Sequence, residues 1–209
     1  MPVNTEITNK NTEELEEETK SLLSKSNFNL LIAHFHLDMN QAVTQVNSYH
    51  DAGDLRLDEK DITLRVRKKK GQYELTLKQD AGDAAKETTY KPLSDEEFND
   101  LRDKGIIPKC NVKDTLREMN IAGTFPYQGD LTTDRIEINY KGCKLALDYN
   151  KYMGEIDYEI EMEKSDADAD QKKILHELLV ELNVPYTPAE CKRRRFFKHK
   201  KAQFFKGEI

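Results

Sequence analysis

The sequence predicts an α+β fold in which antiparallel strands form the sheet and a few helices pack beside it. Residues 62–68 and 73–78 alternate apolar with charged side chains on either side of a glycine-containing turn, and residues 134–140 and 143–148 repeat the pattern. This alternation predicts two β-hairpins, because successive residues of a strand face opposite sides of a sheet. The strand–helix–strand rhythm of a parallel α/β fold is not found.

The N-terminal region is the least regular part of the chain. Residues 1–12 are polar and lack a sustained hydrophobic period, which predicts a loose extension. Taken alone, residues 13–23 look helical, because Glu16 and Lys20 are four residues apart and Glu, Lys and Leu are good helix formers. Local propensity therefore favours a helix here.

The next elements follow from apolar density and capping residues. A helix is predicted over residues 28–35, with Ser24 or Ser26 as its N-cap. Residues 43–49 are predicted to form a strand, and residues 113–119 a short helix.

A capping box marks a further helix. Ser94 and Glu97 have the spacing of this motif, and the helix is predicted to run to Lys104, where Gly105 ends it. A strand is predicted over residues 156–163. The last predicted helix covers residues 170–182, whose apolar residues share one face.

Composition limits the class of protein. A chain of 209 residues is most simply one domain with tails, and its net charge of −6 and pI near 5.5 argue against general nucleic-acid binding. The three cysteines are widely spaced, which fits neither a disulfide framework nor a thiolate zinc site. No apolar run approaches the roughly 20 residues of a membrane span. We expect a cytoplasmic protein without a membrane partner.

The polar faces of the strands segregate their charges. Arg65 and Arg67 share one strand face, whereas Glu159 and Glu161 share another. Clustered carboxylates bind hard divalent cations, and clustered Arg and Lys bind phosphate oxygens. A half-exposed antiparallel sheet also shows charge on one face and is the better explanation for any single strand. Repetition over six strands favours a metal-assisted polyphosphate site in a cavity open to water.

The order of these motifs is similar to that of a known family. Glu16-x-Glu18-x-Lys20 resembles the signature of the CYTH domain, the superfamily of class IV adenylate cyclases, thiamine triphosphatases and inorganic triphosphatases, also called triphosphate tunnel metalloenzymes. The resemblance continues through segments 64–67, 75–78, 144–148, 157–161 and 192–196 and covers about residues 14–197.

The resemblance implies an eight-stranded antiparallel β-barrel, with a charged tunnel inside and helices packed outside. It replaces the helix favoured over residues 14–20 with a strand. The implied organisation is a polar extension over 1–12, a CYTH-like domain over 13–197 and a basic tail over 198–209.

The resemblance also implies roles for individual residues. The metal ligands, for Mg²⁺ or Mn²⁺, would be Glu16, Glu18, Asp148, Glu159 and Glu161. The phosphate-binding residues would be Lys20, Arg65, Arg67, Lys78, Arg135 and Lys192. Lys20 and Tyr49 would be catalytic, with Tyr49 helping to position water beside Lys20. Glu74, Glu137 and Lys144 would line the tunnel without an assigned role.

Two segments depart from the pattern or are open to another interpretation. Where many bacterial relatives read Tyr-Phe-Asp-Thr, this chain has Tyr49-His50-Asp51-Ala52, and we expect His50 to be an exposed or hydrogen-bonded loop histidine. The tail 192–201 is basic with interleaved aromatic residues, so by itself it could bind nucleic acid or an acidic partner. We favour the alternative that Lys192 and Arg195 close the tunnel and the rest is solvated.

The implied function is the metal-dependent hydrolysis of a small-molecule triphosphate compound: inorganic triphosphate, thiamine triphosphate or a nucleoside triphosphate. The first alternative is an adenylate cyclase that makes cyclic AMP from ATP. The second is a polyphosphate- or nucleotide-binding module without turnover. A homodimer is left open.

Overall fold

The computed structural model describes residues 12–16, 18–81, 84–166 and 168–207. The chain falls into two compact units. The first consists mainly of Ser48–Ala81 and Ala85–Gly129, and the second mainly of Glu16–Asn47 and Asp130–Ile209.

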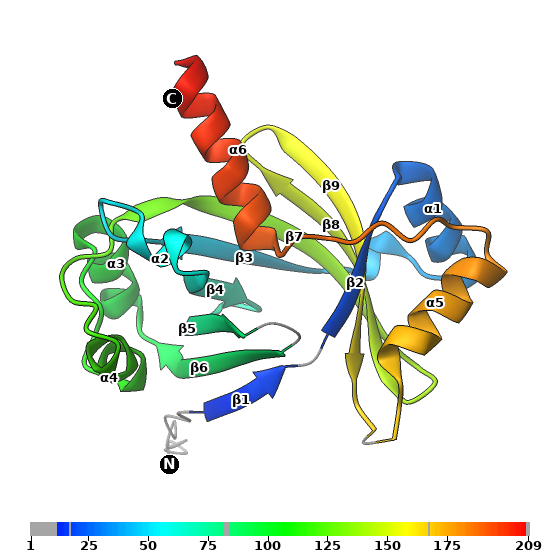
Figure 1. Ribbon diagram of the computed structural model, residues 1–209, viewed down its shortest axis with the longest axis horizontal. Helices are drawn as coiled ribbons and strands as arrows, with labels where there is room; N and C mark the ends of the chain where they lie inside the picture. Colours follow the sequence, from blue (N-terminus) through cyan, green and yellow to red (C-terminus); the bar gives the residue numbers. More distant parts are fainter. Residues whose placement is uncertain (1–11, 17, 82–83, 167, 208–209) are drawn as a thin grey trace, which may run out of the picture. The chain divides into compact units, whose positions relative to one another are not determined.

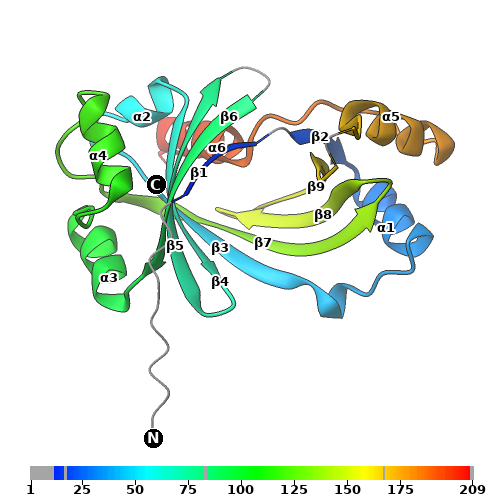
Figure 2. The same ribbon diagram turned by 90° about the horizontal axis from the view of Figure 1, so that it is seen from below.

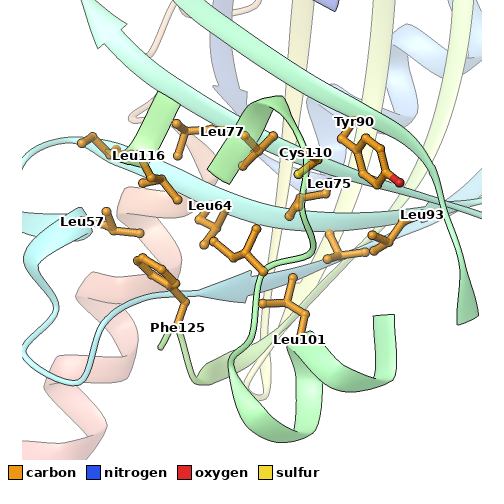
Figure 3. Close-up of a cluster of buried hydrophobic side chains, with 14 of the residues drawn as sticks. Leu57, Leu64, Leu75, Leu77, Tyr90, Leu93, Leu101, Cys110, Leu116 and Phe125 are labelled. Atoms are coloured by element: carbon orange, nitrogen blue, oxygen red, sulfur yellow. The ribbon is translucent and has the colours of Figure 1, made fainter. Parts of the chain in front are cut away.

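The first unit is built on a β-hairpin and the helices that cover its apolar face. Its elements are β1 (Thr12–Glu16), α2 (Arg56–Glu59), β4 (Ile62–Lys69), β5 (Gln72–Ala81), β6 (Ala84–Leu93), α3 (Asp95–Lys104) and α4 (Asn111–Glu118). Leu64 pairs with Leu77 across the antiparallel hairpin, and Leu75 is on the same face. Figure 3 shows these leucines packed among side chains of the helices and the adjoining loops. The predicted hairpin is confirmed.

The helices of the first unit are fixed by local hydrogen bonds. Ser94 and Glu97 form the predicted capping box of α3. Gly105 ends the helix at φ 68°, and a Cβ added there would be 2.8 Å from the Phe125 backbone, so glycine is required for two reasons. The prediction missed α2, in which the buried Asp51 carboxylate accepts hydrogen bonds from the backbone N–H groups of Leu57 and Asp58.

The second unit contains an antiparallel run of strands with helices on its apolar side. Its elements are β2 (Glu18–Leu23), α1 (Lys25–His34), a 3-10 turn (Met39–Gln41), β3 (Val43–His50), β7 (Tyr127–Tyr140), β8 (Cys143–Tyr152), β9 (Glu155–Lys164), α5 (Gln171–Glu181) and α6 (Lys192–Lys206); β3 and β7 each have one end in the first unit. Figures 1 and 2 show β7, β8 and β9 side by side. Ser24 caps α1, as one of the two predicted alternatives had it.

A second apolar core lies between the sheet of this unit and its helices. Leu145 of β8 and Ile160 of β9 point to the same face, where they pack against Leu31 of α1 and Leu178 of α5. Figure 1 shows α1 and α5 beside β2. The alternate residues of β8 and β9 are thereby left for the opposite, charged face.

Hydrogen-bonded neighbours in the sheet follow the order β1-β6-β5-β4-β3-β7-β8-β9-β2. The predicted α+β antiparallel architecture is confirmed, with nine strands described where eight were expected. The count differs at the N-terminal strand, where residue 17, between β1 and β2, lies outside the described residues. The helix that local propensity favours over residues 13–23 is wrong, because pairing of β2 with β9 and burial of Leu23 outweigh propensity.

The C-terminal basic segment forms α6, which runs through the expected boundary at residue 197. Among the described residues, no helix is long and apolar enough to cross a membrane.

Candidate active site

Strand register in the second unit brings the charged residues together. In one cross-strand row, Asp148 lies between Arg135 of β7 and Glu159 of β9. In the next row, Glu161 lies between Ala146 of β8 and Lys20 of β2. Members of a row share one face of the sheet, and residues two apart along a strand do so as well. The small side chain of Ala146 leaves room for the longer ones around it.

Three carboxylates form the centre of the cluster. Asp148, Glu159 and Glu161 each offer an oxygen within 4.8 Å of the others, and all three side chains are buried. Oxygen donors at this spacing suit a hard divalent cation such as Mg²⁺ or Mn²⁺. The donor set therefore fits the metal that the sequence implies.

Arg135 holds two of these carboxylates. Its Nε and Nη2 donate to Asp148 Oδ1 and Oδ2 at 2.6 and 2.5 Å, the forked geometry of a strong charge-assisted pair, and Nη2 also donates to Glu161. Burial acts to raise the pKa of Asp148, but Lys192 and Arg135 outweigh it and hold the pKa at about 2. Burial raises the pKa of Glu161, against the opposing effect of Arg135.

Helix α6 adds two cations from its first turn. Lys192 and Arg195 are three residues apart, so they project from the same side of the helix. Lys192 Nζ lies 2.8 Å from Asp148 Oδ2 and 2.6 Å from Glu161 Oε1, and it also donates to Glu159. Burial lowers the pKa of Lys192 to about 7, although Asp148 acts to raise it.

Arg195 is anchored by a second layer of polar groups. It donates to Glu159, and its Nη1 reaches the carbonyl oxygen of Glu190 at 2.6 Å. Arg195 Nε lies 3.1 Å from Asp157 Oδ2, and Asp157 also accepts from Tyr152 OH at 2.9 Å. Burial raises the pKa of Tyr152, which therefore stays a hydrogen-bond donor. Asp157 shares strand parity with Glu159 and Glu161, and this parity is the signal in the sequence that points to it.

The N-terminal signature is described in part. Lys20 Nζ lies 2.6 Å from Glu18 Oε1. Burial acts to lower the pKa of Lys20, but the carboxylates of Glu18 and Glu161 outweigh it and raise the pKa. Glu16 ends β1, and its side chain lies outside the described part of the structure.

The other predicted site residues belong to the first unit, which is described by itself. Arg65, Arg67 and Lys78 occupy the face of the β4–β5 hairpin opposite its leucines, and Arg65 Nη2 lies 3.3 Å from Glu87 Oε1. Tyr49 is buried in β3. His50 is buried and not exposed, with Nδ1 3.0 Å from the carbonyl oxygen of Phe125.

The residues that were expected to line a tunnel without an assigned role each form an ion pair. Glu137 lies near Arg135 at 3.6 Å, Lys144 contacts Glu163 at 3.0 Å, and Glu74 contacts Lys91 at 3.3 Å.

A sheet with clustered carboxylates and cations on one face, and apolar residues on the other, has the architecture of proteins that bind highly charged ligands. Residues 14–197 match the CYTH domain, so the chain belongs to the CYTH family. It is 32% identical over 190 residues to YjbK of Bacillus subtilis (strain 168), whose name proposes a triphosphatase; the match covers 90% of this chain and 97% of that protein.

Solved structures support the same fold. A Bacillus halodurans protein named as a proposed adenylate cyclase has a TM-score of 0.82 and 33% identity, covering 88% of this chain and 98% of that one. HpAC1 of Hippeastrum, described as having a dominant triphosphatase activity, has a TM-score of 0.71 and 21% identity, covering 88% of this chain and 96% of that one.

Proposed function

We propose that this protein is a metal-dependent triphosphatase, which removes the terminal phosphate of a small triphosphate compound. The observation that carries the proposal is the buried cluster of Asp148, Glu159 and Glu161, held against Arg135 and Lys192 in a CYTH domain. The activity named for YjbK supports hydrolysis, and the name of the Bacillus halodurans protein keeps cyclisation as the alternative that the experiment must distinguish.

The carboxylates and cations of the cluster have complementary roles in this proposal. Asp148, Glu159 and Glu161 would hold Mg²⁺ or Mn²⁺, with Glu16 and Glu18 as further ligands. When bound, the cation would neutralise phosphate oxygens and polarise the phosphorus. The residues that would grip the triphosphate are Lys20, Arg65, Arg67, Lys78, Arg135 and Lys192. Lys20 and Tyr49 would orient the attacking water.

The remaining expectations belong to the same proposal. The catalytic domain is residues 13–197, a range that the family match supports. A cytoplasmic location agrees with three cysteines that are all free thiols. Formation of a homodimer stays a prediction.

The experiment measures phosphate release and cyclic AMP formation side by side, on inorganic triphosphate, thiamine triphosphate and ATP, with Mg²⁺ or Mn²⁺. The proposal expects metal-dependent phosphate release, lost in Glu159→Gln/Glu161→Gln and kept in the exposed control Lys198→Gln. Cyclic AMP from ATP without phosphate release would make the protein a cyclase. Tight binding with neither product would make it a binding module.

A further inference from the structure

The ammonium of Lys192 uses the same oxygens that a divalent cation would need. It contacts Asp148 and Glu161 at 2.8 and 2.6 Å and donates to Glu159 as well. In the described part of the chain, these are its contacts, one carboxylate for each of the three donors that an ammonium carries. No donor is left for another group.

We propose that Lys192 competes with the divalent cation for the Asp148–Glu159–Glu161 oxygens, and that the triphosphate relieves this competition by taking up Lys192. Metal and triphosphate then bind with positive coupling, and Lys192 is the residue that couples them. The inference rests on the proposed use of the cluster as a cation site.

Charge balance supports the competition. Three carboxylates are in direct contact with three cations, Lys192, Arg135 and Arg195, so each already has a positive partner where a metal would bind. A divalent cation added alone would meet a nearby ammonium, and like charges a few ångströms apart in a buried site repel strongly. A triphosphate brings negative charge with the metal and restores the balance.

Anchoring distinguishes Lys192 from the two arginines. Arg135 is held in a fork on Asp148, and Arg195 is also anchored by Asp157 and by the Glu190 carbonyl oxygen. Lys192 is a point charge on a flexible four-carbon stem, so it can exchange carboxylate oxygens for phosphate oxygens without a change in the helix. Because coupling between two ligands is reciprocal, metal should tighten triphosphate binding by the same factor.

The test counts free Mn²⁺ by its electron paramagnetic resonance signal during titration of the full chain, with and without a non-hydrolysable triphosphate analogue, and each titration is referred to the same one without protein because the analogue itself binds Mn²⁺. In the wild type we expect weak binding of Mn²⁺ alone and an increase of about tenfold or more with the analogue, within the usual range of coupling. In Lys192→Met, Mn²⁺ alone should bind about tenfold more tightly, and the increase with the analogue should be smaller than in the wild type, because only direct contact between metal and phosphate remains to couple them.

Lys144→Met is the matched control, because it removes a cation on the same face of β8 as Asp148 whose ion pair is with Glu163 and not with a proposed metal ligand. Equal tightening in both variants would reduce Lys192 to a general electrostatic effect and overturn the proposal, as would unchanged or weaker Mn²⁺ binding in Lys192→Met. If Lys192→Met unfolds without metal, thermal unfolding with added Mn²⁺ decides: a larger rise in Tm than in the wild type supports competition, and an equal or smaller rise rejects it. A protein that shows the competition but releases no phosphate keeps this inference and loses the proposed function.

Discussion

The hairpins of the two units have similar apolar faces, but the charged side chains on their polar faces differ. In the first, Leu64 and Leu75 pack into one core, and in the second, Leu145 and Ile160 pack into another. On the opposite face of the first unit, the Arg65–Glu87 pair has an N–O distance of 3.3 Å. On that of the second, Asp148 and Glu159 are completely buried among cations.

The difference separates what maintains the fold from what performs the chemistry. The apolar faces of both units stabilise the fold in the same way, because burial of hydrocarbon is non-directional. A buried carboxylate is stable only while its partners neutralise it and fill its hydrogen bonds. The second unit therefore concentrates charges whose replacement should affect stability as well as function.

The largest effect should come from breaking the most buried pair. Asp148→Asn removes the charge that Arg135 and Lys192 share, and loss of one partner in a buried pair costs about 3–5 kcal/mol. Urea unfolding at neutral pH would measure it. Asp134→Asn is the control, since its partner Lys151 is 44% exposed and such pairs contribute about 1 kcal/mol or less. Equal losses of stability in the two variants would show that burial of the carboxylate does not determine the cost of removing its charge.

The apolar faces should respond alike in both units. Leu64→Ala and Leu145→Ala each remove a fully buried side chain, so each should lower the free energy of unfolding by about 2–5 kcal/mol. Leu30→Ala, at a side chain 42% exposed, should change much less. If one of these two variants lost about 2–5 kcal/mol and the other lost almost nothing, the two cores would not be equivalent.

Arginines on the first unit's polar face should affect ligand binding and not metal binding. Arg65→Ala or Arg67→Ala should weaken inorganic triphosphate and ATP by similar amounts, about 1.5–3 kcal/mol for one charge-assisted contact. Isothermal titration with Ca²⁺, on the assumption that it supports binding with little turnover, would measure both ligands. A loss confined to ATP would indicate a nucleotide-specific site and favour the cyclase.

Local signals in the sequence predict the elements but not the environment of the charges. Strand alternation is sufficient for the β4–β5 and β7–β8 hairpins, and the Ser94–Glu97 spacing is sufficient for α3. Local signals fail for residues 13–23, because their partner β9 is far along the chain.

Roles in the site depend on contacts that are distant in sequence. Arg195 is held by Asp157, which in turn accepts from Tyr152, and no short motif encodes that network. The double replacement of Glu159 and Glu161 by Gln shows how these contacts change the expected stability of a variant. Strand parity alone suggests relief of crowded negative charge and higher stability, whereas the observed pairs with Arg195, Lys192 and Arg135 indicate a loss.

The two units should also differ in the sign of a pH effect. The folded pKa of Asp148 is about 2, below the usual 3.8, so its contribution, on the order of 2 kcal/mol, is present above pH 3.8 and is lost as pH falls through about 2. Burial raises the pKa of Asp51 in the first unit, although three backbone N–H groups act to lower it. A raised carboxyl pKa has the opposite sign: the stability it contributes is present at pH values below 3.8 and is lost as pH rises through the folded pKa.

Urea unfolding from pH 2 to 7 on the wild type, Asp148→Asn and Asp51→Asn would separate the two contributions. Asp148→Asn should flatten the loss of stability at the acid end, because asparagine does not titrate. Asp51→Asn should flatten the fall in stability above pH 3.8 while leaving the acid limb unchanged. If both variants changed the same limb in the same direction, the contrast between a carboxylate held by cations and one held by backbone dipoles would be wrong.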